Sequence, residues 1–202
     1  ALRPAGGALA ATRGPRTPDA RRVLLLNTTG NDFTSASTTI SVLFMSLEKR
    51  GWGRDEIDVK DRQEGNQVSL APWDFTGLGL YGVVVVVAHG IYATREQLGL
   101  SPPADGDGRS EAFYLQCCNA ADFTNTIYAD QVPTWQAWAR QGSLIEVARP
   151  GSYDVVFLRD DLLKDIVGTL PGTMVYVAAC WGWHARDAFM AKSVLQESTT
   201  DP

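Results

Sequence analysis

The chain has 202 residues, of which 45% are apolar and 20% charged, and its formal net charge is -5. This composition is typical of a globular chain with enough apolar residues for one sizeable core. The mild negative charge argues against a general nucleic-acid-binding protein, and no apolar run reaches the roughly 20 residues that a membrane-spanning helix needs.

Residues 1–21 are rich in Ala, Arg, Pro and Gly without apolar periodicity, which predicts a flexible linker or the remnant of a pro-segment. A single domain is expected over 22–202. Its first strand is predicted at Arg22–Asn27, and the polar stretch Thr28–Ser37 then reads as a strand-to-helix loop. Apolar residues at a spacing close to 3.6 predict a helix over Thr38–Arg50.

A short strand is predicted at Ile57–Lys60, and Pro72 is placed to open a short helix. Tyr81–Ala88, which contains five consecutive valines, is the strongest strand prediction. Alternation of strands and helices indicates crossover units in a parallel sheet, and therefore an α/β fold.

Residues 91–154 are predicted to be an insertion of loops and hairpins beyond the edge of that sheet. They contain paired prolines and an Asp/Gly-rich stretch, with short strands expected at Glu111–Cys117 and Ser143–Ala148. Long insertions of this kind usually shape a substrate cleft.

The C-terminal part is expected to return to the sheet. A short strand is predicted at Asp154–Leu158, an amphipathic helix with an acidic start at Asp160–Val167, and a turn at Pro171-Gly172. A buried central strand follows at Met174–Ala179, and a helix is predicted over Ala185–Leu195.

Two of the predicted strands end on reactive residues. The valine-rich strand runs into His89-Gly90, and the strand from Met174 runs into Cys180. Parallel sheets present their chemistry at the carboxyl ends of the strands, so we expect this His and this Cys at one edge of one sheet. A Cys within reach of a His is the minimal equipment for thiolate nucleophilic catalysis.

The motifs VVVVVAHG and MVYVAAC, in that order, resemble the caspase-like cysteine peptidases, which include caspases, legumains, gingipains and clostripains. The Asp-Leu-Leu helix and the Leu-Pro-Gly-Thr turn before the second motif are similar to the connection in these enzymes. The resemblance covers about Arg22 to Leu195. It implies a three-layer α/β/α sandwich with a mostly parallel central sheet, and a cysteine endopeptidase that acts on peptide or protein substrates without a metal or cofactor.

The resemblance also implies roles for individual residues. His89 would be the general base and acid, and Cys180 the nucleophile; the backbone N–H groups of Gly90 and Cys180 would form the oxyanion hole. Each such donor is worth about 3 kcal/mol of transition-state stabilisation. A nearby His and a helix beginning after Cys180 would both favour the thiolate.

Substrate-binding residues are expected on two loops. In the resembled enzymes a specificity residue follows the first strand, where this chain has Asp32, which would favour cleavage after Arg or Lys. The alternative is that Asp32 only caps the following helix. Trp181 and Trp183 form either an apolar wall of the cleft or part of the core.

The resembled enzymes continue beyond the helix after the catalytic Cys with at least two more strands. We therefore expect the C-terminal strands of the domain to be missing from this chain, whose end point resembles that of the large subunit of a processed enzyme. We accordingly expect a second chain as a partner that completes the domain.

Other readings of the reactive residues stay open. In the first alternative, Cys180 is a buried structural thiol and the domain is an inactive binding or scaffold protein. In the second, the protein is an enzyme that uses Cys180 as an amidase and not as a peptidase. His184 lies close enough in sequence to approach the thiol, or else lies on the rim of the cleft. Cys117 and Cys118 match no compact zinc motif, so no metal site is predicted.

Overall fold

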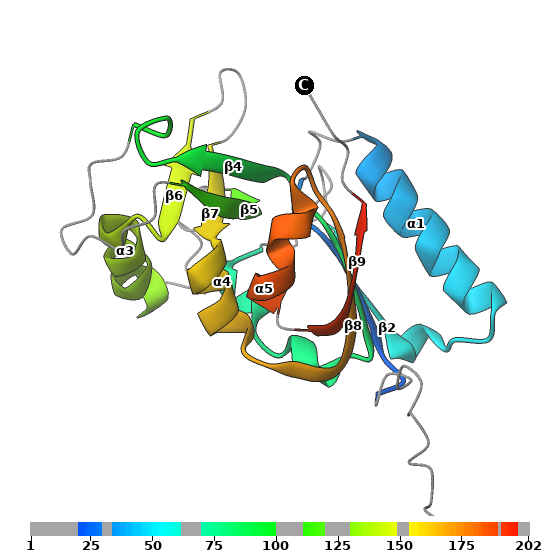
Figure 1. Ribbon diagram of the computed structural model, residues 1–202. Helices are drawn as coiled ribbons and strands as arrows, with labels where there is room; N and C mark the ends of the chain where they lie inside the picture. Colours follow the sequence, from blue (N-terminus) through cyan, green and yellow to red (C-terminus); the bar gives the residue numbers. More distant parts are fainter. Residues whose placement is uncertain are drawn as a thin grey trace, which may run out of the picture.

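Two sheets form the framework of the protein in the computed structural model (Figure 1). The structure describes residues 20–29, 34–61, 70–99, 111–119, 130–148, 154–189 and 191–197. One sheet has five parallel strands in the order β2-β1-β3-β8-β9, and the other has four antiparallel strands in the order β4-β5-β7-β6. This mixed architecture confirms the α/β class predicted from the sequence.

The parallel sheet is built from the apolar runs of the sequence. Its strands are β1 (Val23–Asn27), β2 (Ile57–Asp61), β3 (Val83–Val87), β8 (Leu170–Ala178) and β9 (Ala191–Glu197). Strands β1 and β3 are almost entirely apolar because helices and loops cover both faces of the sheet there.

Helix α1 (Thr34–Lys49) covers one face of the parallel sheet, as Figure 1 shows. Val23 and Leu25 of β1 and Val85 of β3 pack with Ile40 of the helix in one apolar cluster. The alternate residues of the same strands belong to the core on the opposite face. The helix predicted over Thr38–Arg50 is confirmed, with a start four residues earlier.

The opposite face is covered by α4 (Asp160–Val167) and α5 (Ala185–Phe189). The chain between β2 and β3 contributes two short 3-10 helices, η3 (Pro72–Phe75) and η4 (Leu78–Leu80), to the same core. The predicted short helix at Pro72 is therefore present, as a 3-10 turn. A further 3-10 turn, η2 (Arg54–Glu56), leads into β2.

The predicted insertion forms the second sheet. Its elements are β4 (Gly90–Thr94), β5 (Glu111–Asn119), α3 (Val132–Gln141), β6 (Leu144–Val147) and β7 (Val155–Arg159). Tyr114, Ile145 and Phe157 form a small core on one face of this sheet. The expected strands at 111–117 and 143–148 are confirmed, and the strand expected at 154–158 lies in this sheet as β7.

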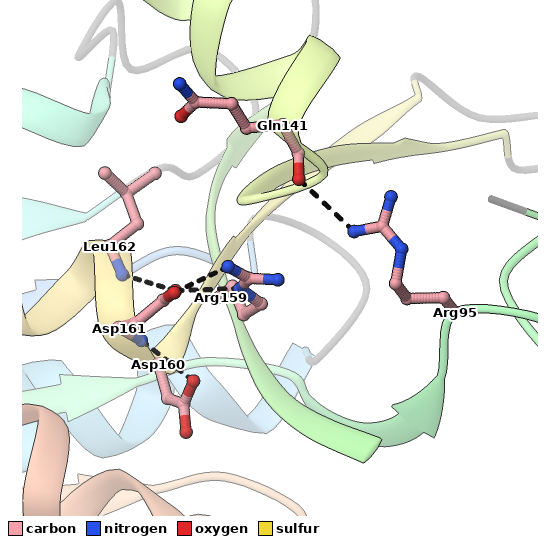
Figure 2. A network of polar contacts seen from close by, with 6 residues as sticks. All are labelled: Arg95, Gln141, Arg159, Asp160, Asp161 and Leu162. Atoms are coloured by element: carbon pink, nitrogen blue, oxygen red, sulfur yellow. Dashed lines mark hydrogen bonds and ion pairs between the residues drawn. The ribbon is translucent and has the colours of Figure 1, made fainter. Parts of the chain in front are cut away.

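A buried arginine anchors the junction between β7 and α4 (Figure 2). Arg159 donates from Nε to Asp161 Oδ1 at 2.8 Å and from Nη2 to Asp161 Oδ2 at 2.6 Å. Asp161 Oδ1 also accepts the N–H of Leu162 at 2.7 Å, and Asp160 Oδ1 accepts the N–H of Asp161 at 2.8 Å. These carboxylates satisfy N–H groups at the start of α4, as expected for acidic residues in a first turn.

The same view shows how the second sheet is tied to its helix. Nη1 of Arg95, in the turn after β4, donates to the carbonyl oxygen of Gln141 at the end of α3, at 3.2 Å (Figure 2). A carbonyl at a helix C-terminus has no partner within the helix, so a cation there is favourable.

Two local predictions are wrong. The helix expected over Ala185–Leu195 ends at Phe189, and β9 follows it, because pairing with β8 supplies its backbone hydrogen bonds. The turn expected at Pro171-Gly172 lies inside β8, where the register with β9 shifts between Leu170 and Met174. Such an irregularity tolerates a proline, which cannot donate to a regular ladder.

None of the helices in the described ranges combines the length and the apolar character needed to cross a bilayer.

Candidate active site

The two strands that end on His89 and Cys180 are neighbours in the parallel sheet. Strand β3 pairs with β8, and the last matched pair is Val87 with Ala178. The N–H of Ala88 then donates to the carbonyl of Ala178 at 3.0 Å, which extends the ladder. Counting two residues onward on both chains places His89 beside Cys180 at the carboxyl edge.

Both residues also follow strand positions that face α1. Val85 and Val87 of β3, and Tyr176 and Ala178 of β8, belong to the cluster under that helix. His89 and Cys180 themselves lie two residues beyond the last residues of these strands, Val87 and Ala178. His89 is half-buried with Nε2 shielded from solvent, and Cys180 is half-buried as well.

Gly90 lies directly against Cys180. A Cβ added to Gly90 would overlap the carbonyl oxygen of Cys180 and lie 2.9 Å from Cε2 of Phe113. Only glycine fits this close approach of two backbones. The His-Gly sequence therefore has a steric cause that is independent of any oxyanion role for the Gly90 N–H.

The residue after Cys180 has an unusual backbone. Trp181 has φ 57° and ψ 19°, and it is the one non-glycine residue with positive φ among the described residues. The left-handed region costs an L-residue roughly 1–2 kcal/mol. Two hydrogen bonds hold the turn: Gly182 N–H to the Ala179 carbonyl at 3.0 Å, and His184 N–H to the Trp181 carbonyl at 2.9 Å.

The helix predicted from Ala185 begins at that residue, but it does not follow Cys180 directly. A 3-10 turn, η6 (Gly182–His184), follows the Cys, and α5 begins only at Ala185 and has five residues. The reason is the strained turn at Trp181, which separates the strand from the helix.

An aromatic cluster surrounds His184. Its ring is stacked on Tyr92 with centroids 4.0 Å apart and lies 3.4 Å from the ring of Trp183. Phe113 and Trp181 lie at 6.1 and 6.3 Å. Burial lowers the pKa of His184, and the nearby carboxylates Asp160 and Glu111 oppose this shift.

Two tryptophans of this cluster face solvent. Trp181 is 48% exposed and Trp183 is 50% exposed, so neither is a core residue. Tyr92 belongs to β4, and desolvation together with Glu111 raises its pKa. The two tryptophans follow Cys180 in the chain, and together with Tyr92 they form an aromatic surface.

A cavity of about 230 Å³ opens beside Cys180 between α1 and the sheet. Most of its lining side chains are small or aliphatic. They are Ser35, Ala36, Thr39, Val85, Val87, Ala88, Tyr176, Ala178, Ala179 and Cys180.

A buried polar cluster, which the sequence reasoning missed, lies at the ends of β1 and β2. Asn27 Nδ2 donates to Asp61 Oδ1 at 2.7 Å, and Ser37 Oγ donates to the same oxygen at 3.1 Å. Asn27 Oδ1 accepts both the N–H and the hydroxyl of Thr29, at 3.0 and 2.7 Å. The only signal in the sequence was that Asn27 and Asp61 each end a strand on a polar residue.

Three further candidates from the sequence are Asp32, Cys117 and Cys118. Asp32 lies outside the described residues, so its predicted role in specificity stays a prediction. Cys117 and Cys118 are buried in β5 with their Sγ atoms 3.0 Å apart. Within the described ranges, no group of three or more His, Cys, Asp or Glu side chains could hold a metal ion.

Comparison with known proteins found no match to this chain among family models, curated proteins or solved structures.

Proposed function

We propose that the protein is a cysteine endopeptidase with a caspase-like three-layer α/β/α sandwich. The observation that supports this most directly is the position of Cys180. It follows a central strand next to the one that ends on His89, it lies at the same edge of the sheet, and a cavity opens beside it. Ligand sites of parallel sheets occur at this edge.

The mechanism follows from these two side chains. His89 accepts the thiol proton, and the Cys180 thiolate attacks the substrate carbonyl carbon to form a tetrahedral intermediate. The N–H groups of Gly90 and Cys180 stabilise its oxyanion. His89 then protonates the departing amine, and water hydrolyses the thioester to restore the thiol. None of these steps uses a metal or organic cofactor.

The strained backbone beside Cys180 favours an active site over a structural thiol. Positive φ at a bulky residue persists only where the surroundings impose it, and such outliers gather at functional sites. Here the residue with positive φ is Trp181, directly after Cys180 in the chain, and its side chain is exposed to solvent. A buried structural cysteine would give no reason for that arrangement.

A partner chain stays part of the proposal. Strand β9 pairs with β8 and ends the parallel sheet in the described part of the chain. Further strands from a second polypeptide could extend the sheet beyond β9. The intact mass of the purified native protein, measured without and with denaturant, tests for such a companion.

The experiment that tests the function is cleavage of fluorogenic peptides by wild type, Cys180→Ala and His89→Ala. We expect loss of turnover in both variants at unchanged melting temperature. Equal turnover by wild type and Cys180→Ala would refute the proposal and favour an inactive scaffold domain. Release of ammonia from small amides, without peptide cleavage, would favour an amidase instead.

A further inference from the structure

We propose that the cavity beside Cys180 binds an uncharged aliphatic side chain, that of the substrate residue whose carbonyl Cys180 attacks. This inference rests on the proposed function and names its substrate class. It differs from the preference for Arg or Lys that the sequence predicts through Asp32.

The place of the cavity identifies which side chain enters it. Cys180 lines the cavity at the edge of the sheet. A thiolate attacks a carbonyl carbon from about 3–3.5 Å. The side chain carried by the Cα bonded to that carbonyl carbon is then the substrate side chain that lies closest to the cavity.

The depth of the cavity follows the strands. From Cys180 its lining runs down β8 to Ala178 and Tyr176, and down β3 to Val87 and Val85. At a rise of about 3.3 Å per residue, the four steps from residue 176 to residue 180 span about 13 Å. Pockets that bind whole small molecules have volumes of about 300–1,000 Å³, and the cavity here, at about 230 Å³, is smaller than that range.

Small residues create the space. Ala36 of α1 and Ala178 of β8 both line the cavity, and so do Ala88 and Ala179 at the edge of the sheet. Deeper in the sheet, the same face holds Val23 and Leu25, which pack with Ile40 of the helix in one apolar cluster.

The chemistry of the lining favours an apolar group. No described residue that lines the cavity is charged. The Thr39 hydroxyl donates to the carbonyl of Ser35 at 2.9 Å, so its hydrogen is already used. An ammonium or guanidinium buried here would lose its hydration without a carboxylate among these lining residues, whereas an aliphatic group gains by leaving water.

The buried carboxylate at the end of β2 already accepts hydrogen bonds from other side chains. Asp61 accepts hydrogen bonds from Asn27 and Ser37, and it is not among the residues that line the cavity. Ala178 lines the cavity two residues before Cys180, so a substitution there would change the size or charge of the cavity next to the thiol.

The test compares labelling rates of Cys180 in the full chain by tripeptide chloromethyl ketones that differ only in the last residue: Leu, Val, Arg or Asp. Iodoacetamide, which needs no side-chain pocket, reports the intrinsic reactivity of the thiol. We expect the Leu or Val reagent to be fastest. One methylene more or less in an apolar pocket changes the reaction rate by about tenfold or more. Ala178→Leu should therefore slow labelling by the Leu reagent by at least that factor, measured relative to the rate of labelling by iodoacetamide.

Two further variants sharpen the result. Ala178→Asp should shift the preference toward the Arg reagent, because it adds a carboxylate to the lining. Ala139→Leu, on the exposed side of α3, makes the same change in size away from the cavity and should leave the ranking unchanged. Melting temperatures show whether each variant folds, and the wild-type ranking needs no variant at all.

The two proposals fail in different ways. Fastest labelling by the Arg or Asp reagent would overturn the cavity assignment, whether or not the protein cleaves peptides. Fastest labelling by Leu or Val in a protein that cleaves no peptide would remove the endopeptidase and leave the cavity assignment in place. Equal rates for all four reagents would overturn the assignment.

Discussion

The backbone of Gly90 lies against the carbonyl group of Cys180, so closely that a side chain on residue 90 would overlap the carbonyl oxygen. This contact joins the start of β4, where the chain leaves the parallel sheet, to the end of β8, where the candidate nucleophile lies. The position of Cys180 therefore depends on the junction between the two sheets.

Gly90→Ala is expected to destabilise the protein by about 1–3 kcal/mol, the usual cost of overpacking, because backbone atoms on both sides must move. The matched control is Gly79→Ala, whose added Cβ would meet only Leu170 Cδ2 at an ordinary 3.7 Å. Urea denaturation of both variants measures the difference. A Gly90→Ala variant as stable as Gly79→Ala would contradict the close contact.

Substitutions of Trp181 are expected to show an inverted order of stability. Glycine adopts positive φ without strain, so Trp181→Gly should be more stable than Trp181→Ala by about 1 kcal/mol. At an ordinary helical position the order is the reverse. Both variants remove the exposed indole, so both should bind peptide substrates more weakly, measured as a rise in KM. Greater stability of the alanine variant would argue against a left-handed residue 181.

The half-buried His184 of the aromatic cluster is expected to make stability depend on pH. The pKa of His184 is lowered in the folded state, so the unfolded chain binds the proton more tightly. Its contribution is complete above the unfolded pKa of 6.5 and is lost as the pH falls through that value toward the lowered folded pKa.

His184→Phe keeps an aromatic ring but cannot titrate, and it tests this expectation. Between about pH 7 and pH 5 the free energy of unfolding should fall less steeply in the variant than in wild type. Equal slopes would show that His184 titrates alike in both states. His89, the other histidine, is unchanged in both proteins and cancels in the comparison.

The polar cluster at the ends of β1 and β2 is expected to be strongly coupled. Asn27→Leu removes the 2.7 Å hydrogen bond to the buried Asp61 carboxylate, at an expected cost of about 2–3 kcal/mol. Ser37→Ala removes a longer bond, of 3.1 Å, and should cost about 1 kcal/mol.

The double variant Asn27→Leu/Asp61→Leu should recover part of the loss, because no buried charge is then left without its donor. Chemical denaturation of Asn27→Leu, Asp61→Leu and the double variant completes the thermodynamic cycle. Strictly additive effects would contradict a direct interaction between the two side chains.

Several elements could be predicted from the sequence because their signal is local. The valine run of β3 and the apolar spacing of α1 reflect burial along a single element. Helix α4 matches its predicted bounds, since two acidic residues mark its first turn and an amphipathic pattern follows.

The errors came where pairing between distant segments decides the structure. The segment after Phe189 has a pattern compatible with a helix, and only its partner β8 makes it a strand. In the same way, Pro171 looks like a turn residue until the register shift between β8 and β9 gives it a place within a strand.

For the candidate site, the sequence by itself determined that a His and a Cys end two buried strands, because apolar runs mark buried strands in any context. Only the tertiary structure decided that those strands are neighbours, that Gly90 lies against Cys180, and that a cavity whose described lining residues carry no charge opens beside the thiol. Strand order, close backbone contacts and cavities all depend on residues far apart in the chain, and no local pattern specifies them.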